Sequence, residues 1–422
     1  AAFGGAEIMK RFAAVLFFFI AFLYNGYARA DAAAAVVLEA QTGRVLYAVN
    51  ETQTLPMAST TKIMTALVAL ENADLSDIVT TGDNAYGVPG TSIYLQKGEQ
   101  LTLEQMLYGL MLASGNDAAV AIAEHVSGSV SGFCDMMNAR ARQIGCENTH
   151  FVTPHGLPAQ QHYTTAYDLA LIAREAMKNA DFRRIVSTQH ATIPWHGHDY
   201  DRVLTNKNRL LSAYPGALGI KTGYTEKAGY CLVSAVQRDG VNVIAVVLGA
   251  DGDTAAKEFD SFADTVTLLD WCFENYSYRS IVERGYPAAA QPIEKDGRRG
   301  EITLVCSQEI NALAEKALDS STLKSEVTLY AETLTDVPAE GTELGKVTFS
   351  DPGDGTVYGT VTLVSQGEAR FEEPEPQTVR PQELSREQKL ATVIVCSIAV
   401  FLLLVFILLL VRRSRRMRRK RR

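Results

Sequence analysis

Apolar residues recur at two different periods along the first 277 residues, and the two periods predict strands and helices. The runs 34–40 and 45–49 are short and apolar with a four-residue polar turn between them, which predicts a β-hairpin. The runs 230–236 and 241–249 flank Asp239-Gly240, and an Asp-Gly pair between two apolar runs favours a tight hairpin turn. Each end of this region is therefore expected to supply strands.

Between these hairpins the apolar positions recur at helical spacing. Thr102 and Gln105 have the pattern of a capping box at the start of one helix. An antiparallel sheet made from the two ends, with the helices inserted between them, would give an α+β domain over 31–277. The predicted helices cover 59–71, 102–112, 117–126, 133–144 and 166–179, and a further helix is predicted from about 254 to 275.

From residue 278 the pattern changes to short alternating strands separated by Pro, Gly and Asp turns. This pattern predicts a small all-β domain over 278–370. The following segment, 371–389, is acidic and rich in Pro, and we expect it to form an extended stalk. The strands predicted in the small domain are 301–306, 325–330, 345–349 and 357–364.

Both ends of the chain have the composition of membrane-targeting segments. Residues 390–411 carry no charge over 22 residues, which is enough to cross a bilayer. Nine of the eleven residues in 412–422 are Lys or Arg, so the positive-inside rule predicts a cytoplasmic tail. Within residues 1–30, Met9-Lys10-Arg11, an apolar run and Ala28-Arg29-Ala30 predict a signal peptide after an upstream extension. A single-pass cell-membrane protein with an extracytoplasmic domain is expected.

Charge and cysteine content narrow the possible functions. The 40 Lys and Arg include nine in the tail, so 31 remain against 48 acidic residues, a net charge of −17 that disfavours nucleic acid as a partner. One of the six cysteines, Cys396, lies in the predicted span, and the irregular spacing of the other five indicates neither a disulfide framework nor a zinc site. Cys134 and Cys146 could pair in an oxidising compartment, although buried free thiols are the expected state.

The first candidate catalytic residues are Ser59 and Lys62, which are three residues apart at the start of an apolar helix. Residues at this spacing share a helix face, and burial disfavours a charged ammonium, so Lys62 could act as a base toward Ser59. By itself the pattern is weak, because about one Ser-x-x-Lys arises by chance in a chain this long. A second copy occurs at Ser321 and Lys324. The alternative interpretation is a helix N-cap beside a surface amine.

Two later motifs strengthen this interpretation. Ser59-x-x-Lys62, Ser114-Gly115-Asn116 and Lys221-Thr222-Gly223 occur in the order found in penicillin-recognising serine acyltransferases. The chain resembles the low-molecular-mass penicillin-binding proteins that are D-alanyl-D-alanine carboxypeptidases, and Pro154-His155-Gly156-Leu157 adds to the likeness. The resemblance implies a β-lactamase-like transpeptidase domain (an antiparallel sheet with a helical subdomain), a small all-β domain and one C-terminal transmembrane helix.

The resemblance also implies the catalytic roles. Ser59 would be the nucleophile and Lys62 its base, with an acyl-enzyme on Ser59 that water releases. Ser114 would relay a proton to the departing D-alanine, and Asn116 would hold the substrate amide and Lys62. Lys221 would help to keep Lys62 neutral.

The same resemblance implies how the substrate is bound. Lys221 would attract the terminal carboxylate of a peptidoglycan stem peptide, and Thr222 would donate a hydrogen bond to it. Gly223 would let the substrate backbone lie close to the strand. The backbone N–H groups of Ser59 and Tyr224 would form the oxyanion hole. β-Lactams would acylate Ser59, and no metal or cofactor is expected.

One position departs from the family pattern. Relatives often carry an Arg ten residues before the tryptophan of the closing helix, whereas Ser261 stands ten residues before Trp271 here. Lys257, one turn upstream, could replace the missing charge. This departure concerns the recognition of the substrate carboxylate and leaves the nucleophile unaffected.

Several alternative functions share parts of this pattern. A class A β-lactamase needs a Glu-x-x-x-Asn loop, and Glu175 and Asn179 have that spacing only within a predicted helix. A D,D-endopeptidase would use the same site, and a membrane-anchored β-lactam sensor or scaffold would need an output domain longer than eleven cytoplasmic residues. His196-Gly197-His198 is expected to be solvated surface rather than a metal site.

Overall fold

The computed structural model describes residues 30–253, 258–372 and 385–419. The predicted signal segment, Lys257 and most of the predicted stalk lie outside the described residues. Two compact units are present, and each is assembled from more than one stretch of the sequence. The first comprises the chain up to Tyr286 with Gln308–Glu326 and Val347–Val361, and the second comprises Pro287–Ser307, Val327–Lys346 and the chain from Thr362.

A five-stranded antiparallel sheet lies at the centre of the first unit, in the order β2-β1-β9-β8-β7. Both predicted hairpins form, β1 with β2 and β8 with β9, and the two ends of the region meet where β1 pairs with β9. Positive φ angles at Asp239 (51°) and Gly240 (79°) give the second hairpin the tight turn that its sequence predicts. The strands are β1 (Ala34–Glu39), β2 (Val45–Val49), β7 (Ala217–Thr225), β8 (Gly229–Arg238) and β9 (Val241–Ala250).

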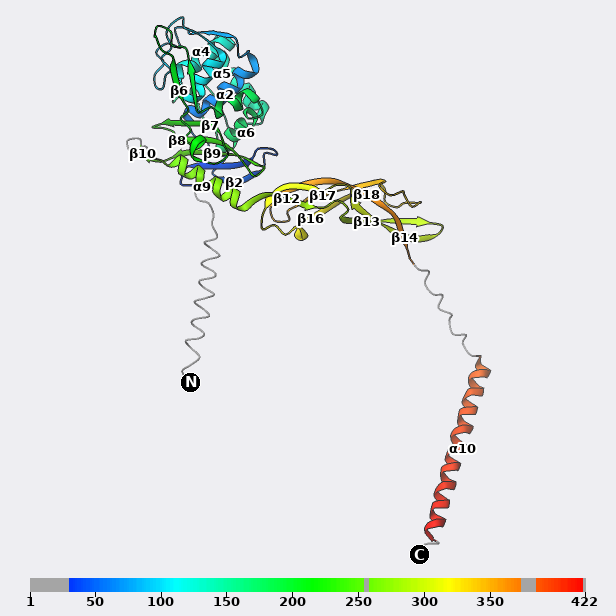
Figure 1. The fold of residues 1–422 in the computed structure, drawn as a ribbon. Helices are drawn as coiled ribbons and strands as arrows, with labels where there is room; N and C mark the ends of the chain where they lie inside the picture. The colour runs from blue at the N-terminus through cyan, green and yellow to red at the C-terminus, as the bar shows by residue number, and fades with distance from the viewer. Residues whose placement is uncertain (1–29, 254–257, 373–384, 420–422) are drawn as a thin grey trace, which may run out of the picture. The chain divides into compact units, whose positions relative to one another are not determined.

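Side-chain alternation divides the core between the two faces of this sheet. Val36 and Leu38 pack into a cluster with the helices on one face, whereas Ala35 and Val37 pack with α9 (Asp260–Asn275) on the other. Burial on both faces explains why β1 and β9 are continuously apolar. Figure 1 shows α2, α4, α5 and α6 on one side of β7, β8 and β9, with α9 on the opposite side.

The helical layer follows the predicted order. The capping box at Thr102 is present, since Gln105 N donates to Thr102 Oγ1 and Thr102 N donates to Gln105 Oε1. The helix predicted at 102–112 changes to a π-helical segment, η2 (Gly109–Ala113), before it ends. The other elements are η1 (Ala58–Thr61), α2 (Lys62–Asn72), α3 (Leu103–Tyr108), α4 (Asn116–Ser127), α5 (Val130–Ile144), α6 (Ala166–Ala176), α7 (Ala180–Ser187), α8 (Leu210–Ala213) and the strand pairs β3 (Ile78–Thr80) with β4 (Gln100–Thr102) and β5 (His190–Ile193) with β6 (Arg202–Thr205).

Two predicted helix boundaries are wrong. The helix predicted at 166–179 ends at Ala176, because the Asn179 side chain accepts hydrogen bonds from Asp181 N and Phe182 N and thereby starts a new helix, α7. The helix predicted from 254 begins only at Asp260, after a short strand pair formed by β10 (Gly252–Asp253) and β11 (Glu258–Phe259).

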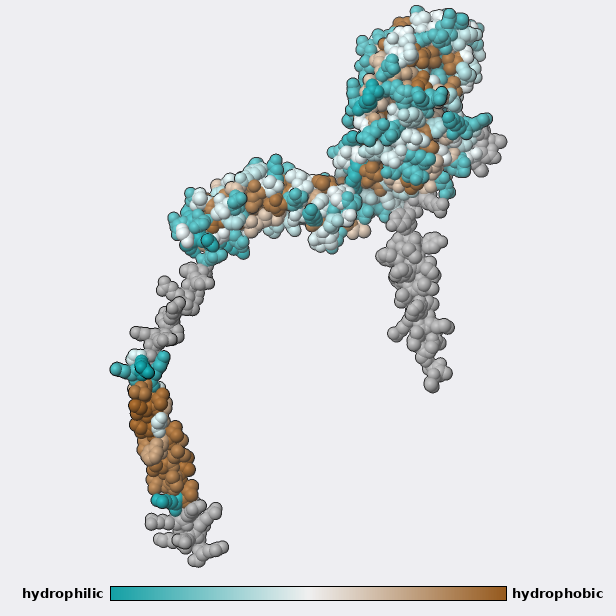
Figure 2. Space-filling model, turned by 180° about the vertical axis from the view of Figure 1, so that it is seen from behind, coloured by the Kyte–Doolittle hydropathy of each residue, from teal (hydrophilic) through white to brown (hydrophobic). Residues whose placement is uncertain are grey.

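The remainder of the described chain is mostly β-structure followed by one helix. A second five-stranded sheet has the order β13-β14-β18-β17-β16 and contains all four strands predicted there, whereas β12, β13 and β15 were not predicted. α10 (Arg386–Arg419) contains a candidate membrane span, Arg386–Arg412, and apolar side chains cover its surface in Figure 2. The strands are β12 (Tyr276–Val282), which pairs with β15 (Ile310–Glu315), and β13 (Pro287–Lys295), β14 (Arg298–Cys306), β16 (Lys324–Leu329), β17 (Glu343–Ser350) and β18 (Val357–Phe371).

Candidate active site

Ser59 and Lys62 lie together where α2 begins. Ser59 belongs to the 3₁₀ turn η1, and the hydroxyls of Thr60 and Thr61 tighten this turn by donating back to Met57 O and Ala58 O at 2.5 and 2.8 Å. Lys62 Nζ lies 2.9 Å from Ser59 Oγ. Lys62 is fully buried, while Ser59 is half-buried and lines a cavity.

The surroundings of the Lys62 amine allow it to act as a base. Its nitrogen lies 2.8 Å from Asn116 Oδ1 and 2.7 Å from His155 O, and both oxygens only accept hydrogen bonds. A neutral amine has two N–H bonds for these two acceptors, which leaves its lone pair for the Ser59 hydroxyl. Burial, followed by the charges of Lys221 and Lys207, lowers the pKa of Lys62 well below its ordinary value. A neutral Lys62 can therefore take a proton from Ser59.

Ser114 and Asn116 reach the same place from the turn between η2 and α4. Ser114 adopts the left-handed conformation (φ 68°), which ends the π-helical segment and brings its side chain to the wall of the cavity. Asn116 Nδ2 donates to Pro89 O at 2.7 Å, and this contact orients the amide with Oδ1 toward Lys62. Both side chains are buried.

Strand β7 supplies the opposite wall. Lys221 is buried, its Nζ donates to Thr222 O at 3.1 Å, and burial with the nearby Lys207 charge lowers the pKa of Lys221 to about 7. A Cβ atom on Gly223 would lie only 3.0 Å from Ser59 N, so a side chain here would force the backbone at Ser59 to move by a few tenths of an ångström. Tyr224 is exposed, and its ring stacks on Tyr230 with centroids 4.4 Å apart.

Residues from all three motifs line one cavity of about 690 Å³, whereas Lys62, Asn116 and Lys221 lie behind its lining. Ser261, the position that departs from the family pattern, lines it and is buried. Lys207 and Arg209 also line the cavity, and no motif in the sequence indicated either of them. The complete lining consists of Ser59, Thr91, Ser114, Thr205, Asn206, Lys207, Arg209, Thr222, Gly223, Tyr224, Tyr230, Cys231, Ser261 and Phe262.

The Pro154-His155-Gly156-Leu157 loop supports α2 from behind. Thr65 Oγ1 donates to Pro154 O at 2.6 Å, next to the His155 carbonyl that accepts from Lys62. Desolvation, and then the Lys62 charge, lower the pKa of His155 to about 4, so this imidazole is neutral at physiological pH. Gly156 has a φ of +87°, and a Cβ atom there would lie 1.9 Å from Ala58 O.

We therefore expect Gly156→Ala to disturb the nucleophile from outside the cavity. The left-handed backbone at an alanine and the collision with Ala58 O should lower the free energy of unfolding by about 1–3 kcal/mol or more. The collision should also slow the acylation of Ser59, because Ala58 directly precedes it. Thermal unfolding and the rate of labelling by a fluorescent penicillin would measure the two effects. Gly128→Ala is the matched control, because Gly128 has a φ of +78° but nothing within 4 Å of its Cβ position. Equal acylation rates in the two variants would contradict this account.

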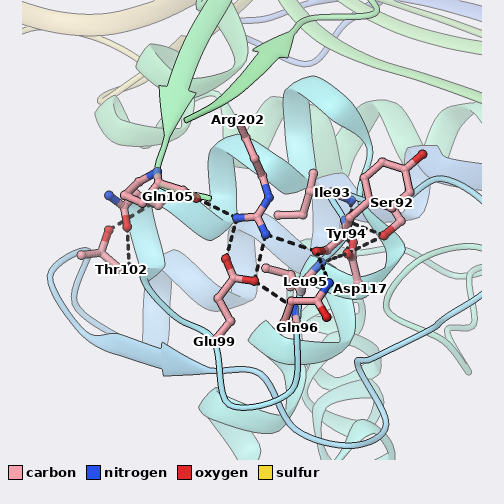
Figure 3. Close-up of polar contacts among 11 residues, drawn as sticks. Ser92, Ile93, Tyr94, Leu95, Gln96, Glu99, Thr102, Gln105, Asp117 and Arg202 are labelled. Atoms are coloured by element: carbon pink, nitrogen blue, oxygen red, sulfur yellow. Dashed lines mark hydrogen bonds and ion pairs between the residues drawn. The ribbon is translucent and has the colours of Figure 1, made fainter. Parts of the chain in front are cut away.

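A buried polar network holds the segment that precedes the cavity wall (Figure 3). Asp117 accepts hydrogen bonds from Ser92 Oγ (2.6 Å), Ile93 N (3.1 Å) and Leu95 N (3.0 Å). Farther along, Arg202 pairs with Glu99 through two contacts of 2.6 and 2.8 Å, and both side chains are buried. Asn116, which directly precedes Asp117, is bound to the same segment, because Asn116 N donates to Thr91 O at 2.7 Å.

The structure separates the other candidate residues from this cavity. Ser321 lies exposed in the 3₁₀ turn η3 (Ser320–Thr322), so the second Ser-x-x-Lys match is not a helical pair. Glu175 is paired with Arg140 at 2.7 Å and with Lys178 at 2.6 Å. Asn179 caps α7, so the prediction that it lies inside the same helix as Glu175 is wrong.

The remaining predicted features are structural. Cys134 and Cys146 are buried free thiols, and desolvation raises the pKa of Cys134 to about 11. His198 packs against Trp195 with ring centroids 4.3 Å apart, and His196 is exposed in the same loop. Within the part of the chain that the structure describes, no cluster of His, Cys, Asp and Glu could hold a metal ion.

Comparisons with known proteins agree with this geometry. The pattern of the D-alanyl-D-alanine carboxypeptidase family matches residues 25–252. The chain is 36% identical over 329 residues to the D-alanyl-D-alanine carboxypeptidase DacF of Bacillus subtilis, which covers 77% of this chain and 82% of that protein. A second relative, the D-alanyl-D-alanine carboxypeptidase DacD of Escherichia coli, is 31% identical over 349 residues, or 79% of this chain and 86% of that protein.

Solved structures show the same fold. Penicillin-binding protein 5 from Haemophilus influenzae superposes with a TM-score of 0.63 and 28% identity, over 82% of this chain and 99% of that one. A variant of the Streptomyces K15 DD-transpeptidase superposes with a TM-score of 0.55 and 34% identity, over 59% of this chain and 100% of that one. Because the family pattern covers more than half of the sequence and full-length relatives align over most of it, the chain belongs to the D-alanyl-D-alanine carboxypeptidase family of penicillin-binding serine peptidases.

Proposed function

We propose that Ser59 attacks the carbonyl carbon of the penultimate D-alanine in a peptidoglycan stem peptide that ends in D-Ala-D-Ala. Lys62 takes the hydroxyl proton as the Oγ–C bond forms, and the tetrahedral intermediate collapses by breaking the bond to the terminal D-alanine. The carrying observation is that Lys62 Nζ, buried and with a lowered pKa, lies 2.9 Å from Ser59 Oγ; when this amine is neutral, its two N–H bonds can go to the oxygens of Asn116 and His155 while its lone pair accepts the Ser59 proton.

The departing amine must receive a proton when the peptide bond breaks. Ser114 lines the same cavity as Ser59, and we assign to its hydroxyl the transfer of the proton from Lys62 to the leaving nitrogen. Water then attacks the acyl-enzyme, with Lys62 again taking a proton, and the shortened peptide leaves. A β-lactam would form the same ester with Ser59, and its amine would remain attached to the acyl group.

The developing oxyanion requires donors beside Ser59. The backbone of β7 at Gly223 lies close to Ser59 N in η1. We assign the oxyanion hole to the backbone N–H groups of Ser59 and Tyr224. Loss of one such donor typically lowers turnover by about 10²- to 10³-fold. Thr222, which faces the cavity, is assigned to the substrate carboxylate.

We extend the proposal to the location of this site. The candidate span in α10 would anchor the chain in the cell membrane, with the basic residues 412–422 on the cytoplasmic side. Residues 1–30 would direct export, so that the catalytic domain over 31–277 and the β domain over 278–370 face the peptidoglycan, with 371–389 as a stalk. The neighbouring charge pattern and the length of the apolar segment support this orientation.

The decisive experiment combines turnover with the location of the adduct. The full chain in detergent should release D-alanine from diacyl-L-Lys-D-Ala-D-Ala. After incubation with benzylpenicillin, peptide mass spectrometry should place the covalent adduct on Ser59. An adduct on Ser114 or Ser321, or D-alanine release that benzylpenicillin does not block, would refute the proposal.

The assigned role of Lys221 predicts a shift in pH dependence. The positive charge of Lys221 is the second cause, after burial, of the lowered pKa of Lys62. Lys221→Met removes that charge and should raise the pKa of Lys62. Since acylation needs neutral Lys62, the acidic limb of the acylation rate against pH should move to higher pH. Lys227→Met is the control, because Lys227 is exposed in the turn after β7. An unchanged acidic limb in Lys221→Met would rule out this coupling.

A further inference from the structure

Three aromatic side chains gather at the surface near the active-site cavity. Tyr94 and Tyr200 are 66% and 62% exposed, and Trp195 is half-buried and packs with both. The rings of Tyr94 and Trp195 are nearly parallel, at 19° with centroids 6.4 Å apart, and the Tyr200 ring meets Trp195 edge-on at 5.6 Å. These three residues form an aromatic platform that the chemistry at Ser59 does not use.

Tyr94 keeps its ring exposed at a cost to its backbone. Its φ is 64°, in the left-handed region that a bulky residue rarely adopts. The backbone N–H groups on both sides of it, at Ile93 and Leu95, donate to the buried carboxylate of Asp117. Tyr94 N itself donates to Ser92 Oγ at 2.8 Å (Figure 3). Strain of this kind persists only where surrounding contacts enforce it, and it concentrates at functional sites.

Arg202 fixes the two segments that carry the platform. It donates to Tyr94 O at 3.2 Å and to Pro194 O, the carbonyl directly before Trp195, at 2.7 Å. Its guanidinium carbon also lies 5.3 Å from the centroid of the Trp195 ring. The buried ion pair with Glu99 holds Arg202 in this position. The exposed rings are therefore ordered before any ligand arrives, which lowers the entropic cost of binding.

The platform is connected to the cavity through two short segments. Tyr94 is three residues beyond Thr91, which lines the cavity. Arg202 is three residues before Thr205, another lining residue, and three residues of β6 span about 10 Å. The carbonyl that Ser59 attacks belongs to the fourth residue of a pentapeptide stem, and four extended residues reach about 13–14 Å. The sugar that carries the stem can therefore lie outside the cavity, at the platform.

Sugar rings suit such a surface. A pyranose presents C–H groups on its faces and hydroxyls around its edge, so a face can pack on an aromatic ring while the edge stays hydrated. We propose that the aromatic platform binds sugar rings of the glycan strand to which the stem peptide is attached. The inference rests on the proposed function, because it assumes a stem peptide seated beside Ser59. It makes the chain act preferentially on stems that are still attached to glycan.

The first test compares two substrates of the full chain in detergent. One is an uncrosslinked glycan strand that bears pentapeptides, and the other is the same pentapeptide freed from its sugar. Wild type should have the higher kcat/KM, counted per stem, on the glycan strand. Tyr94→Gly should lower that value by about 3- to 10-fold, the usual worth of one aromatic contact, and leave the free peptide nearly unaffected. Tyr94→Phe keeps the ring and should keep the preference.

Two controls separate this role from a structural one. Glycine tolerates the left-handed backbone at position 94, so Tyr94→Gly should unfold near the wild-type temperature. Gln161→Gly is the matched variant, because Gln161 is also exposed and has the same φ of 64° but carries no ring. It should leave kcat/KM unchanged on both substrates.

A binding measurement without turnover isolates the sugar. The chain contains two tryptophans, so Ser59→Ala/Trp271→Phe leaves Trp195 as the one fluorescent indole. Glycan strands from which an amidase has removed the peptides should change the Trp195 fluorescence in a saturable way, and the free pentapeptide should not. Adding Tyr94→Gly should raise the glycan concentration needed for half-saturation by about 3- to 10-fold.

The possible failures are distinguishable. Equal kcat/KM of wild type on the two substrates would overturn the inference, while D-alanine release sustained the proposed function. Equal losses on both substrates in Tyr94→Gly would overturn it too, as would a fluorescence response to the free pentapeptide instead of the stripped glycan. If wild type neither releases D-alanine nor forms a penicillin adduct on Ser59, the proposed function fails, and the glycan titration still decides whether the platform binds sugar.

Discussion

Lys62→Met should lower the rate of Ser59 acylation by about 10³-fold or more while the protein remains folded. General bases contribute about 10²- to 10⁴-fold, and Lys62 also holds Ser59 and Asn116 in place, so the upper part of that range is expected. Methionine has a similar length but no lone pair of comparable basicity. Acylation by a fluorescent penicillin and release of D-alanine would both measure the loss.

The same substitution should leave stability unchanged or increased. The lowered pKa of Lys62 means that the unfolded chain binds its proton more tightly than the folded chain does. At neutral pH the buried amine therefore opposes folding, and a buried methionine would remove that cost. Ser59→Ala is the control for complete loss of the nucleophile. A variant Lys62→Met that unfolds more easily than wild type, or that acylates at the wild-type rate, would contradict this assignment.

Glu99→Leu should give the largest loss in the free energy of unfolding, about 3–5 kcal/mol, because it leaves the buried guanidinium of Arg202 without its carboxylate partner. Burial by itself would raise the pKa of Glu99, but its hydrogen bond and charge interaction with Arg202 lower it overall. The pair therefore stabilises the fold at pH values above the ordinary pKa of a glutamate. This contribution is lost as the pH falls through the lowered pKa that Glu99 has in the folded protein. Denaturant unfolding at neutral and acidic pH would measure both effects.

Two comparisons make this prediction specific. Glu99→Leu/Arg202→Leu removes both charges and should be more stable than Glu99→Leu alone. Lys97→Gln breaks the nearby pair with Asp83, whose side chain is 82% exposed, and should change stability by less than about 1 kcal/mol. If Glu99→Leu and Lys97→Gln unfolded at the same denaturant concentration, the buried pair would not have the role given to it here.

Local sequence patterns were sufficient for the parts of the fold that depend on near neighbours. Asp239-Gly240 specifies a hairpin because both residues tolerate positive φ, and Thr102 with Gln105 specifies a helix start through two reciprocal hydrogen bonds. The wrong helix boundary near Asn179 has a similar cause. The apolar spacing continues past Ala176, so it predicts one helix, although Asn179 is an N-cap residue that starts a second one. Strand β13 was missed because Pro287 and Pro292 disfavour a strand, yet β13 is an edge strand, where proline is tolerated.

Contacts between distant residues could not be predicted in this way. The three motifs predicted which residues would meet at the cavity because their order matches a known family, whereas Glu99 and Arg202 are 103 positions apart and belong to no motif. Arg209 carries no local signal either, since an arginine before a short helix is normally surface. Its place beside the cavity follows from how α8 and α9 pack around the sheet.

Strand β7 is the last strand of the central sheet, so only one of its edges is paired. Exposed strand edges attract other extended chains, but η1, α7 and α8 contact much of β7 and leave Thr222–Tyr224 open to the cavity. An extended peptide can join such an edge through main-chain hydrogen bonds, which are indifferent to side-chain chemistry. Stem peptides that differ in the side chain of their third residue should therefore be accepted in the same register, with the two D-alanines still delivered to Ser59.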